Sequence, residues 1–180
     1  HAEKAVDTGV DGLILLTAGA GGQTGWANPF AFVRAVREIY EGPVVLAGGV
    51  SDGVALRAAM TLGCDLAYMG TRFIATQESM AVQAYKDMLV TSSLDDVILT
   101  SAFTGLPASK LRPSLVAAGL DPDALPERGM INVSEDINPD KRPKRWKDTW
   151  SAGHSVSGVK DVPPVAELIN RLVAEYDSAA

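Results

Sequence analysis

Apolar residues along this chain fall into short continuous runs separated by longer stretches with helical spacing. Three runs, residues 13–16, 44–47 and 66–69, are short and apolar, as expected of strands buried on both faces. Between them, residues 29–40 and 51–62 have the periodicity of amphipathic helices. This alternation with short connections predicts an α/β fold built from parallel strand–helix–strand units with right-handed crossovers.

The second half of the chain departs from this alternation. Residues 78–89 predict a helix, residues 96–101 a further β segment, and residues 165–176 an amphipathic helix with a single buried stripe. Prolines punctuate residues 105–150, where only 114–119 predicts a short helix. We therefore interpret residues 105–150 as an irregular insertion, suited to a lid or a substrate loop.

Three segments follow from this interpretation. Residues 1–104 form the strand–helix units, 105–150 the insertion or lid, and 151–180 a last loop with the C-terminal helix. The chain begins with His1, and residues 2–6 resemble the last turns of a helix. The sequence therefore predicts a fragment, whose site needs either a missing N-terminal half or a homo-oligomer.

Charge and cysteine content exclude several classes of partner. The formal net charge is −6, whereas nucleic-acid binding requires clustered Lys and Arg. No apolar stretch approaches the roughly 20 residues of a membrane span, and no signal peptide is recognisable, so we expect a cytoplasmic protein. Cys64 is the only cysteine, which excludes an internal disulfide, and we expect it to be a buried hydrophobe.

Two glycine-containing turns carry the candidate chemistry. Gly48 and Gly49 follow one predicted strand, and Met69-Gly70-Thr71 follows the next. Glycines let backbone N–H groups approach a ligand closely and adopt positive φ, and the following helix adds a favourable field for an anion. The two turns therefore predict half of a phosphate-binding site for a nucleotide-type cofactor. The alternative, glycines needed only for turn geometry and packing, stays open.

The motifs together resemble the second half of the nitronate monooxygenase family, formerly called 2-nitropropane dioxygenases. The resemblance covers residues 1–105 and resumes at 150–176. It is carried by Gly12-Leu13-Ile14, Gly21-Gly22-Gln23-Thr24-Gly25, Ala47-Gly48-Gly49-Val50-Ser51-Asp52-Gly53, Met69-Gly70-Thr71-Arg72-Phe73 and Ala152-Gly153.

This resemblance implies a (β/α)8 TIM-barrel flavoprotein that binds FMN at the C-terminal ends of its strands. It further implies that the first glycine loop, with Gly22, lies beside the flavin ring. The implied phosphate ligands are the backbone groups of the two turns, with the Thr71 hydroxyl as a further donor. These cofactor-binding residues are Gly22, Gly48, Gly49, Met69, Gly70 and Thr71.

Two side chains are candidates for the catalytic step. The family commonly has His where this chain has Gln23, and an amide cannot act as a general base near neutrality. His154 stands where relatives often have Gln, and its imidazole titrates in the useful range, although a surface or packing role is an alternative. We expect Arg72, beside the second turn, to pair with a carboxylate.

The resemblance implies an FMN-dependent oxidoreductase that oxidises nitronates or nitroalkanes with O2 as the acceptor. One alternative is an NAD(P)H-dependent FMN reductase acting on a quinone or an enoyl thioester. Another is an inactive half-barrel that binds phosphate ligands weakly or needs a complementary chain. A phosphosugar isomerase is disfavoured, because no Lys, Glu or Asp ends the strands at 13–16 or 44–47.

Overall fold

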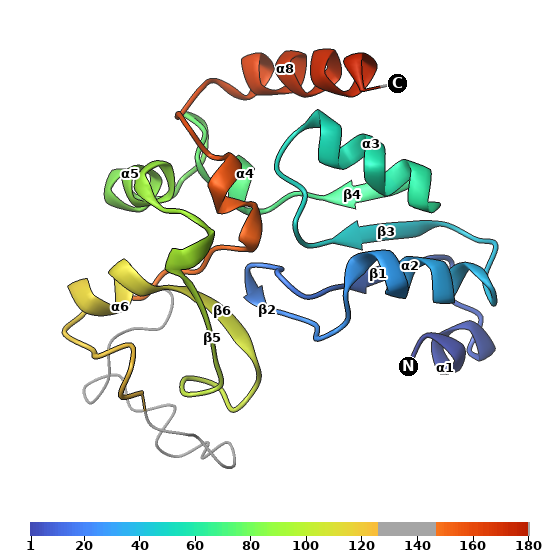
Figure 1. Ribbon diagram of the computed structural model, residues 1–180, viewed down its shortest axis with the longest axis horizontal. Helices are drawn as coiled ribbons and strands as arrows, with labels where there is room; N and C mark the ends of the chain where they lie inside the picture. Colours follow the sequence, from blue (N-terminus) through green and yellow to red (C-terminus); the bar gives the residue numbers. More distant parts are fainter. Residues whose placement is uncertain (126–146, 180) are drawn as a thin grey trace.

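The computed structural model describes residues 1–125 and 147–179. Two groups of elements lie side by side: a parallel sheet with its covering helices, and an antiparallel sheet with several short helices (Figure 1). In the described part of the chain, no helix combines the length and apolarity needed to cross a membrane.

The parallel sheet confirms the predicted strand–helix units. Its strand order is β1-β3-β4, and every neighbouring pair is parallel. Helices connect the strands and cover one face of the sheet. The elements are α1 (Ala2–Asp7), β1 (Leu13–Leu16), α2 (Pro29–Arg37), β3 (Val44–Ala47), α3 (Gly53–Leu62) and β4 (Leu66–Tyr68).

Local sequence signals set the ends of the two connecting helices. The Asn28 side chain accepts a hydrogen bond from the Phe30 N–H at 2.9 Å, with Pro29 at the first helical position. Asp52 caps α3 in the same way through the Ala55 N–H at 2.7 Å. Gly63, at φ 112°, ends α3 in the left-handed conformation that glycine adopts without strain.

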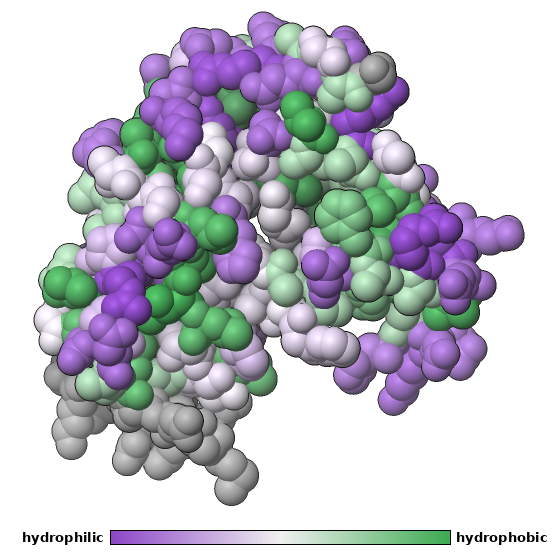
Figure 2. Space-filling view, in the orientation of Figure 1, coloured by the Kyte–Doolittle hydropathy of each residue, from purple (hydrophilic) through white to green (hydrophobic). Residues whose placement is uncertain are grey.

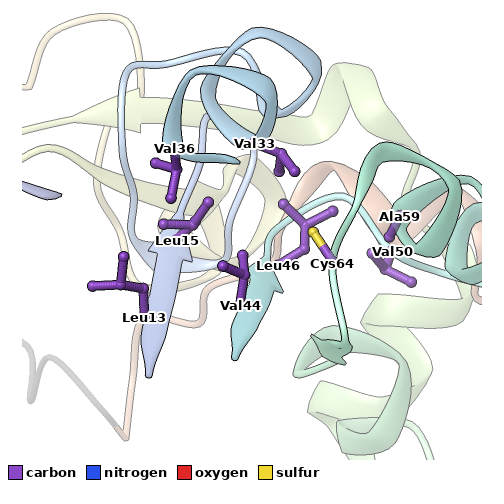
Figure 3. Packing of buried hydrophobic residues seen from close by; sticks show 9 residues of the cluster. All are labelled: Leu13, Leu15, Val33, Val36, Val44, Leu46, Val50, Ala59 and Cys64. Carbon is purple, nitrogen blue, oxygen red and sulfur yellow. The ribbon is translucent and has the colours of Figure 1, made fainter. Parts of the chain in front are cut away.

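The first hydrophobic core lies between the parallel sheet and helices α2 and α3 (Figure 3). The Cys64 thiol belongs to it, as expected, and burial raises the pKa of that thiol. The buried members are Leu13, Leu15, Val33, Val36, Val44, Leu46, Val50, Ala59 and Cys64.

The opposite face of the same sheet is also apolar but is left open. Ile14 is 62% exposed, Leu66 61% and Tyr68 66%, although the side chains alternating with them face the core. A strand that is apolar on both faces is typical of a parallel sheet covered on both sides. This open face is the inner side of a partial barrel.

The second group of elements contains an antiparallel sheet of order β2-β6-β5 and a second core. The sheet joins the glycine loop after β1 to the middle of the chain, since Gln23 pairs with Ala108. Its strands are β2 (Gly22–Gln23), β5 (Val97–Thr100) and β6 (Ala108–Leu111). The helices of this group are α4 (Thr71–Ile74), α5 (Gln83–Thr91), η1 (Leu94–Asp96), α6 (Arg112–Ala117) and η2 (His154–Gly158). Helix α8 (Val165–Ser178) follows them in the chain but packs against α3.

The structure corrects the predicted irregularity of residues 105–150. Strand β6 and helix α6 occupy 108–117, and α6 begins two residues before the predicted 114–119 helix. This four-residue strand was missed because two of its buried residues, Ser109 and Lys110, are polar and interrupt the apolar run expected of a buried strand. Residues 126–146 of the predicted insertion lie outside the described residues.

The helix predicted at 78–89 begins only at Gln83. The buried Lys86 ammonium explains the difference, because it donates hydrogen bonds to the carbonyl oxygens of Thr76 at 2.7 Å, Ser79 at 2.8 Å and Gln77 at 3.3 Å. These carbonyls therefore surround a cation and do not join a helical ladder. The Glu78 carboxylate accepts the Val165 N–H at the start of α8 instead.

The C-terminal helix α8 packs against α3 at a point where only glycine fits. A Cβ on Gly53 would collide with the Leu172 carbonyl oxygen and the Tyr176 nitrogen. The Glu175 carboxylate also accepts the Gly53 N–H at 2.8 Å. The last helix of the chain therefore caps the helix that follows the first glycine turn.

Truncation of a buried leucine tests the assignment of the first core. Leu15 is buried in the first core, whereas Leu99, also in a strand, is 67% exposed. We expect Leu15→Ala to lower the free energy of unfolding by about 2–5 kcal/mol through lost burial and the cavity left behind. Leu99→Ala is the matched control and should cost less than about 1 kcal/mol in urea unfolding. Equal losses would contradict the assigned core.

Candidate functional site

A cavity of about 570 Å³ opens where the carboxyl ends of β1, β3 and β4 face the second group of elements. Its size is within the usual range of cofactor and ligand pockets. Figure 2 shows the molecule hollowed between the two groups of elements. The lining is Ile14, Leu16, Gly19, Ala20, Gly21, Gly22, Ala47, Gly48, Gly49, Val50, Tyr68, Gly70, Thr71, Ile74, Tyr85, Thr149, Trp150, Ser151 and Ser155.

The turn after β3 presents its backbone to this cavity. Gly48 and Gly49 have φ 130° and φ 78°, values that other residues rarely adopt. A Cβ on Gly48 would lie 2.7 Å from the Thr17 hydroxyl oxygen, so the turn is also pressed against the loop after β1. A Cβ on Gly49 would meet no atom within 4 Å, because that side of the residue is open space.

The turn after β4 also has open space beside its glycine, although its backbone conformation differs from that of the turn after β3. Gly70 has a negative φ of −84°, so the expected positive φ does not apply to it. A Cβ there would also meet no atom within 4 Å. Within residues 1–125 and 147–179, no backbone or side-chain acceptor takes the N–H of Gly49 or Gly70. Thr71 begins α4, so its N–H has no acceptor within the helix.

Thr71 connects this turn to the last loop of the chain. Its side chain is buried, and its hydroxyl oxygen accepts the Gly153 N–H at 3.0 Å. The hydroxyl proton stays available for donation, because a hydroxyl both accepts and donates. Thr71 therefore combines an N–H and an O–H at the cavity wall.

The loop at Ala152–His154 lies against the glycine loop after β1 with almost no space between the two backbones. A Cβ on Gly21 would lie 2.7 Å from the Gly153 nitrogen, and one on Gly153 would lie 2.6 Å from the Gly19 carbonyl oxygen. The His154 N–H donates to that same carbonyl oxygen at 2.8 Å. The close approach of the two loops closes one side of the cavity.

Of the eight predicted site residues, five line the cavity: Gly22, Gly48, Gly49, Gly70 and Thr71. The other three are placed outside its lining. Gln23 is exposed on β2, His154 is exposed with its ring over Gly19, and the Met69 side chain packs against the first core.

Arg72 forms an ion pair, as expected. Its buried guanidinium lies 2.8 Å from Asp161 Oδ1 and also donates to the Ala75 and Asp161 carbonyl oxygens. Burial acts to raise the pKa of Asp161, but Arg171 and Arg72 hold it below the ordinary value. The Arg72 guanidinium thus links α4 to the segment that precedes α8.

Two aromatic residues of the cavity wall were not among the predicted site residues. The Tyr85 and Trp150 rings stack with centroids 5.0 Å apart and an interplanar angle of 17°. The Tyr85 hydroxyl donates to the Ser151 carbonyl oxygen, and burial raises the pKa of Tyr85 to about 12. Because 65 positions separate the two residues in the sequence, their contact at the cavity could not be predicted from local patterns.

The electrostatic character of the cavity follows from its lining. Among the described residues that line it, none is Asp, Glu, His, Lys or Arg. The polar groups there are hydroxyls and backbone amides. The site can therefore orient an anion through neutral donors, and it offers no side chain that would take a proton near neutral pH.

Backbone amides with no acceptor among the described residues lie at the carboxyl ends of parallel strands beside a cavity, which is where TIM-barrel enzymes bind their ligands. Comparison with known proteins gives the family. The family model described as nitronate monooxygenase matches residues 1–175, and the chain belongs to that family. Its members are flavin-dependent oxidoreductases.

The chain is similar to several characterised proteins. It is 29% identical to a nitronate monooxygenase of Paraburkholderia phytofirmans over 97% of this chain and 51% of that protein. It is 34% identical, over 64% of this chain and 33% of the relative, to a "(3aS,4S,5R,7aS)-5-hydroxy-7a-methyl-1-oxo-octahydro-1H-indene-4-carboxyl-CoA dehydrogenase" of Rhodococcus jostii.

Among solved structures, FabK from Thermotoga maritima, a TIM-barrel enzyme, superposes with a TM-score of 0.75 at 27% identity. That match covers 98% of this chain and 58% of FabK. The chain thus spans about half the length, or less, of the relatives and structures that it matches. The parallel sheet described above is part of a TIM barrel.

The buried Tyr85 hydroxyl predicts a loss of stability at alkaline pH. An unfolded tyrosine ionises near pH 10, whereas Tyr85 in the fold holds its proton to about pH 12. Between these values the folded state binds more protons than the unfolded state, so stability falls as pH rises, by about 2 kcal/mol. Urea unfolding at about pH 9 and about pH 11.5 should show a smaller decrease for Tyr85→Phe than for the wild type. An identical decrease would place the Tyr85 hydroxyl in water.

Proposed function

We propose that this protein is an FMN-dependent oxidoreductase of the nitronate monooxygenase type, which oxidises nitronates with O2. The observation that supports it most is a pair of turns, at Gly49 and Gly70, that line one cavity and whose N–H groups have no acceptor among the described residues. A phosphate needs several convergent donors, and backbone amides at helix starts supply them.

The residues present fit FMN. The N–H groups of Gly49, Gly70 and Thr71, with the Thr71 hydroxyl, would hold its phosphate, and Gly22 would leave room for the flavin at the cavity wall. When bound, FMN supplies the capacity to accept electrons from the substrate and pass them to O2. The apolar lining would exclude water from the ring.

The uncharged lining favours a substrate that arrives as an anion. A neutral nitroalkane must lose the proton next to its nitro group, and a base within hydrogen-bond reach is needed for that step. Neither Gln23 nor His154 lines the cavity. A preformed nitronate needs no such base, so the proposal names nitronates ahead of nitroalkanes.

A second candidate is an NAD(P)H-dependent FMN reductase on the same scaffold, acting on a quinone or an enoyl thioester. The structural similarity to FabK and the relative named as a carboxyl-CoA dehydrogenase favour it. We propose in either case that the open face at Ile14, Leu66 and Tyr68 is covered by a further barrel half or a second copy. That face would otherwise leave apolar surface and a strand edge in water.

Alanine at Gly49 tests the phosphate site against a matched control. Gly49 and Gly9 have nearly the same φ, 78° and 76°, and a Cβ at either meets no atom within 4 Å. Both variants should therefore lose a similar stability, about 1–2 kcal/mol. We expect only Gly49→Ala to weaken FMN binding, by about tenfold or more, because its methyl group occupies phosphate space. Flavin fluorescence titration measures this, and equal FMN affinities for both variants would count against the site.

Anaerobic titration of the FMN-loaded full-length protein separates the two candidate reactions. Propane-2-nitronate should bleach the flavin absorbance, whereas neutral 2-nitropropane should do so at least about tenfold more slowly, because none of the described lining residues can remove its proton. Reduction by NADH with turnover of a quinone, and no bleaching by the nitronate, would replace the leading proposal with the second candidate.

A further inference from the structure

The stacked pair Tyr85 and Trp150 is a fixed wall of the cavity and not a loose surface contact. Besides the Tyr85 hydroxyl bond to Ser151, the Trp150 N–H donates to the Ser114 hydroxyl at 2.5 Å. Its indole Nε1–H donates to the Lys147 carbonyl oxygen at 3.1 Å. Both rings also pack against the second core. The orientation of the wall is thus set before any ligand arrives, which lowers the entropy cost of binding.

The wall and the phosphate turns belong to different parts of the molecule. Gly49 and Gly70 follow strands of the parallel sheet, whereas Tyr85 lies on α5 and Trp150 precedes η2. The cavity therefore has a polar backbone side for an anion and an aromatic side with no charged residue among its described lining residues. Aromatic side chains favour flat partners in stacked or edge-to-face contact.

We propose that Tyr85 and Trp150 form a specificity subsite for a flat conjugated group, such as an aryl ring, attached to the reacting anionic centre of the substrate. The inference rests on the proposed function only in taking this cavity as the place where substrate and flavin meet. The apolar stacked rings select for ring-bearing substrates, and they contribute nothing to the recognition of the anionic group itself.

Benzoate and acetate test this subsite, because both are unreactive planar anions and differ only in the ring. Their dissociation constants are measured on the FMN-loaded full-length protein by perturbation of the flavin absorbance. We expect benzoate to bind about five- to tenfold more tightly than acetate. Trp150→Leu should reduce this preference to about twofold or less, with acetate binding and FMN binding unchanged.

Trp26→Leu is the matched control, since Trp26 is 94% exposed and outside the cavity lining. It should keep the full preference for benzoate. Trp150→Phe retains a ring and should restore most of the preference, while thermal unfolding shows whether each variant is folded. Quenching of tryptophan fluorescence by benzoate in flavin-free protein, lost in Trp150→Leu and kept in Trp26→Leu, is a readout independent of turnover.

The outcomes separate this inference from the proposed function. A benzoate preference that depends on Trp150 supports the subsite even where nitronates fail to reduce the flavin. An equal preference in wild type and Trp150→Leu overturns it. So does a Trp150→Leu variant that loses acetate and benzoate equally or that no longer binds FMN, because the ring would then serve the anion or the cofactor.

Discussion

The close contact of two backbones at Gly21 and Gly153 is the constraint on which the site depends. No side chain fits at either position, and the Gly153 N–H is bonded to the Thr71 hydroxyl. Gly21 follows β1 and Thr71 follows β4, which are the two edge strands of the parallel sheet. The loop at Ala152–His154 therefore contacts the segments that follow both edge strands. Any residue larger than glycine would separate the loops and open the side of the cavity that they close.

The proposed phosphate site differs from an arginine- or lysine-based one in how its attraction depends on distance. Arg72 is the cation nearest in sequence to the second turn, and it is already paired with Asp161. Attraction would therefore come from amide and hydroxyl dipoles, which act only over short distances and require the turn geometry to be fixed in advance. The ion pair supports that geometry, since it holds the short helix α4, whose first N–H groups would form part of the proposed site.

Sequence patterns predicted the parts of this molecule that depend on local chemistry. The continuous apolar runs identified the three strands of the parallel sheet, and the helical periodicity identified α2 and α3 between them. The two predicted turns supply four of the predicted cavity residues, and the glycine loop after β1 supplies Gly22. Contacts between distant segments were not predictable: the Lys86 ammonium that prevents an early start of α5, the pairing of Gln23 with Ala108, and the stacking of Tyr85 on Trp150. Gln23 and His154 were placed by motif alone, and motif spacing does not fix side-chain direction.

The capping of α3 by Glu175 has a consequence for how the molecule is made. The turn at Gly49 precedes α3, and the Gly53 N–H at the start of α3 donates to Glu175 of α8. The second turn is likewise held by later residues, because Gly153 bonds to Thr71 and Asp161 pairs with Arg72. A ribosome synthesises residues 153–175 about a hundred positions after the turns that they hold. The carboxyl end of the sheet therefore reaches its final geometry only after the segment up to Glu175 has left the ribosome.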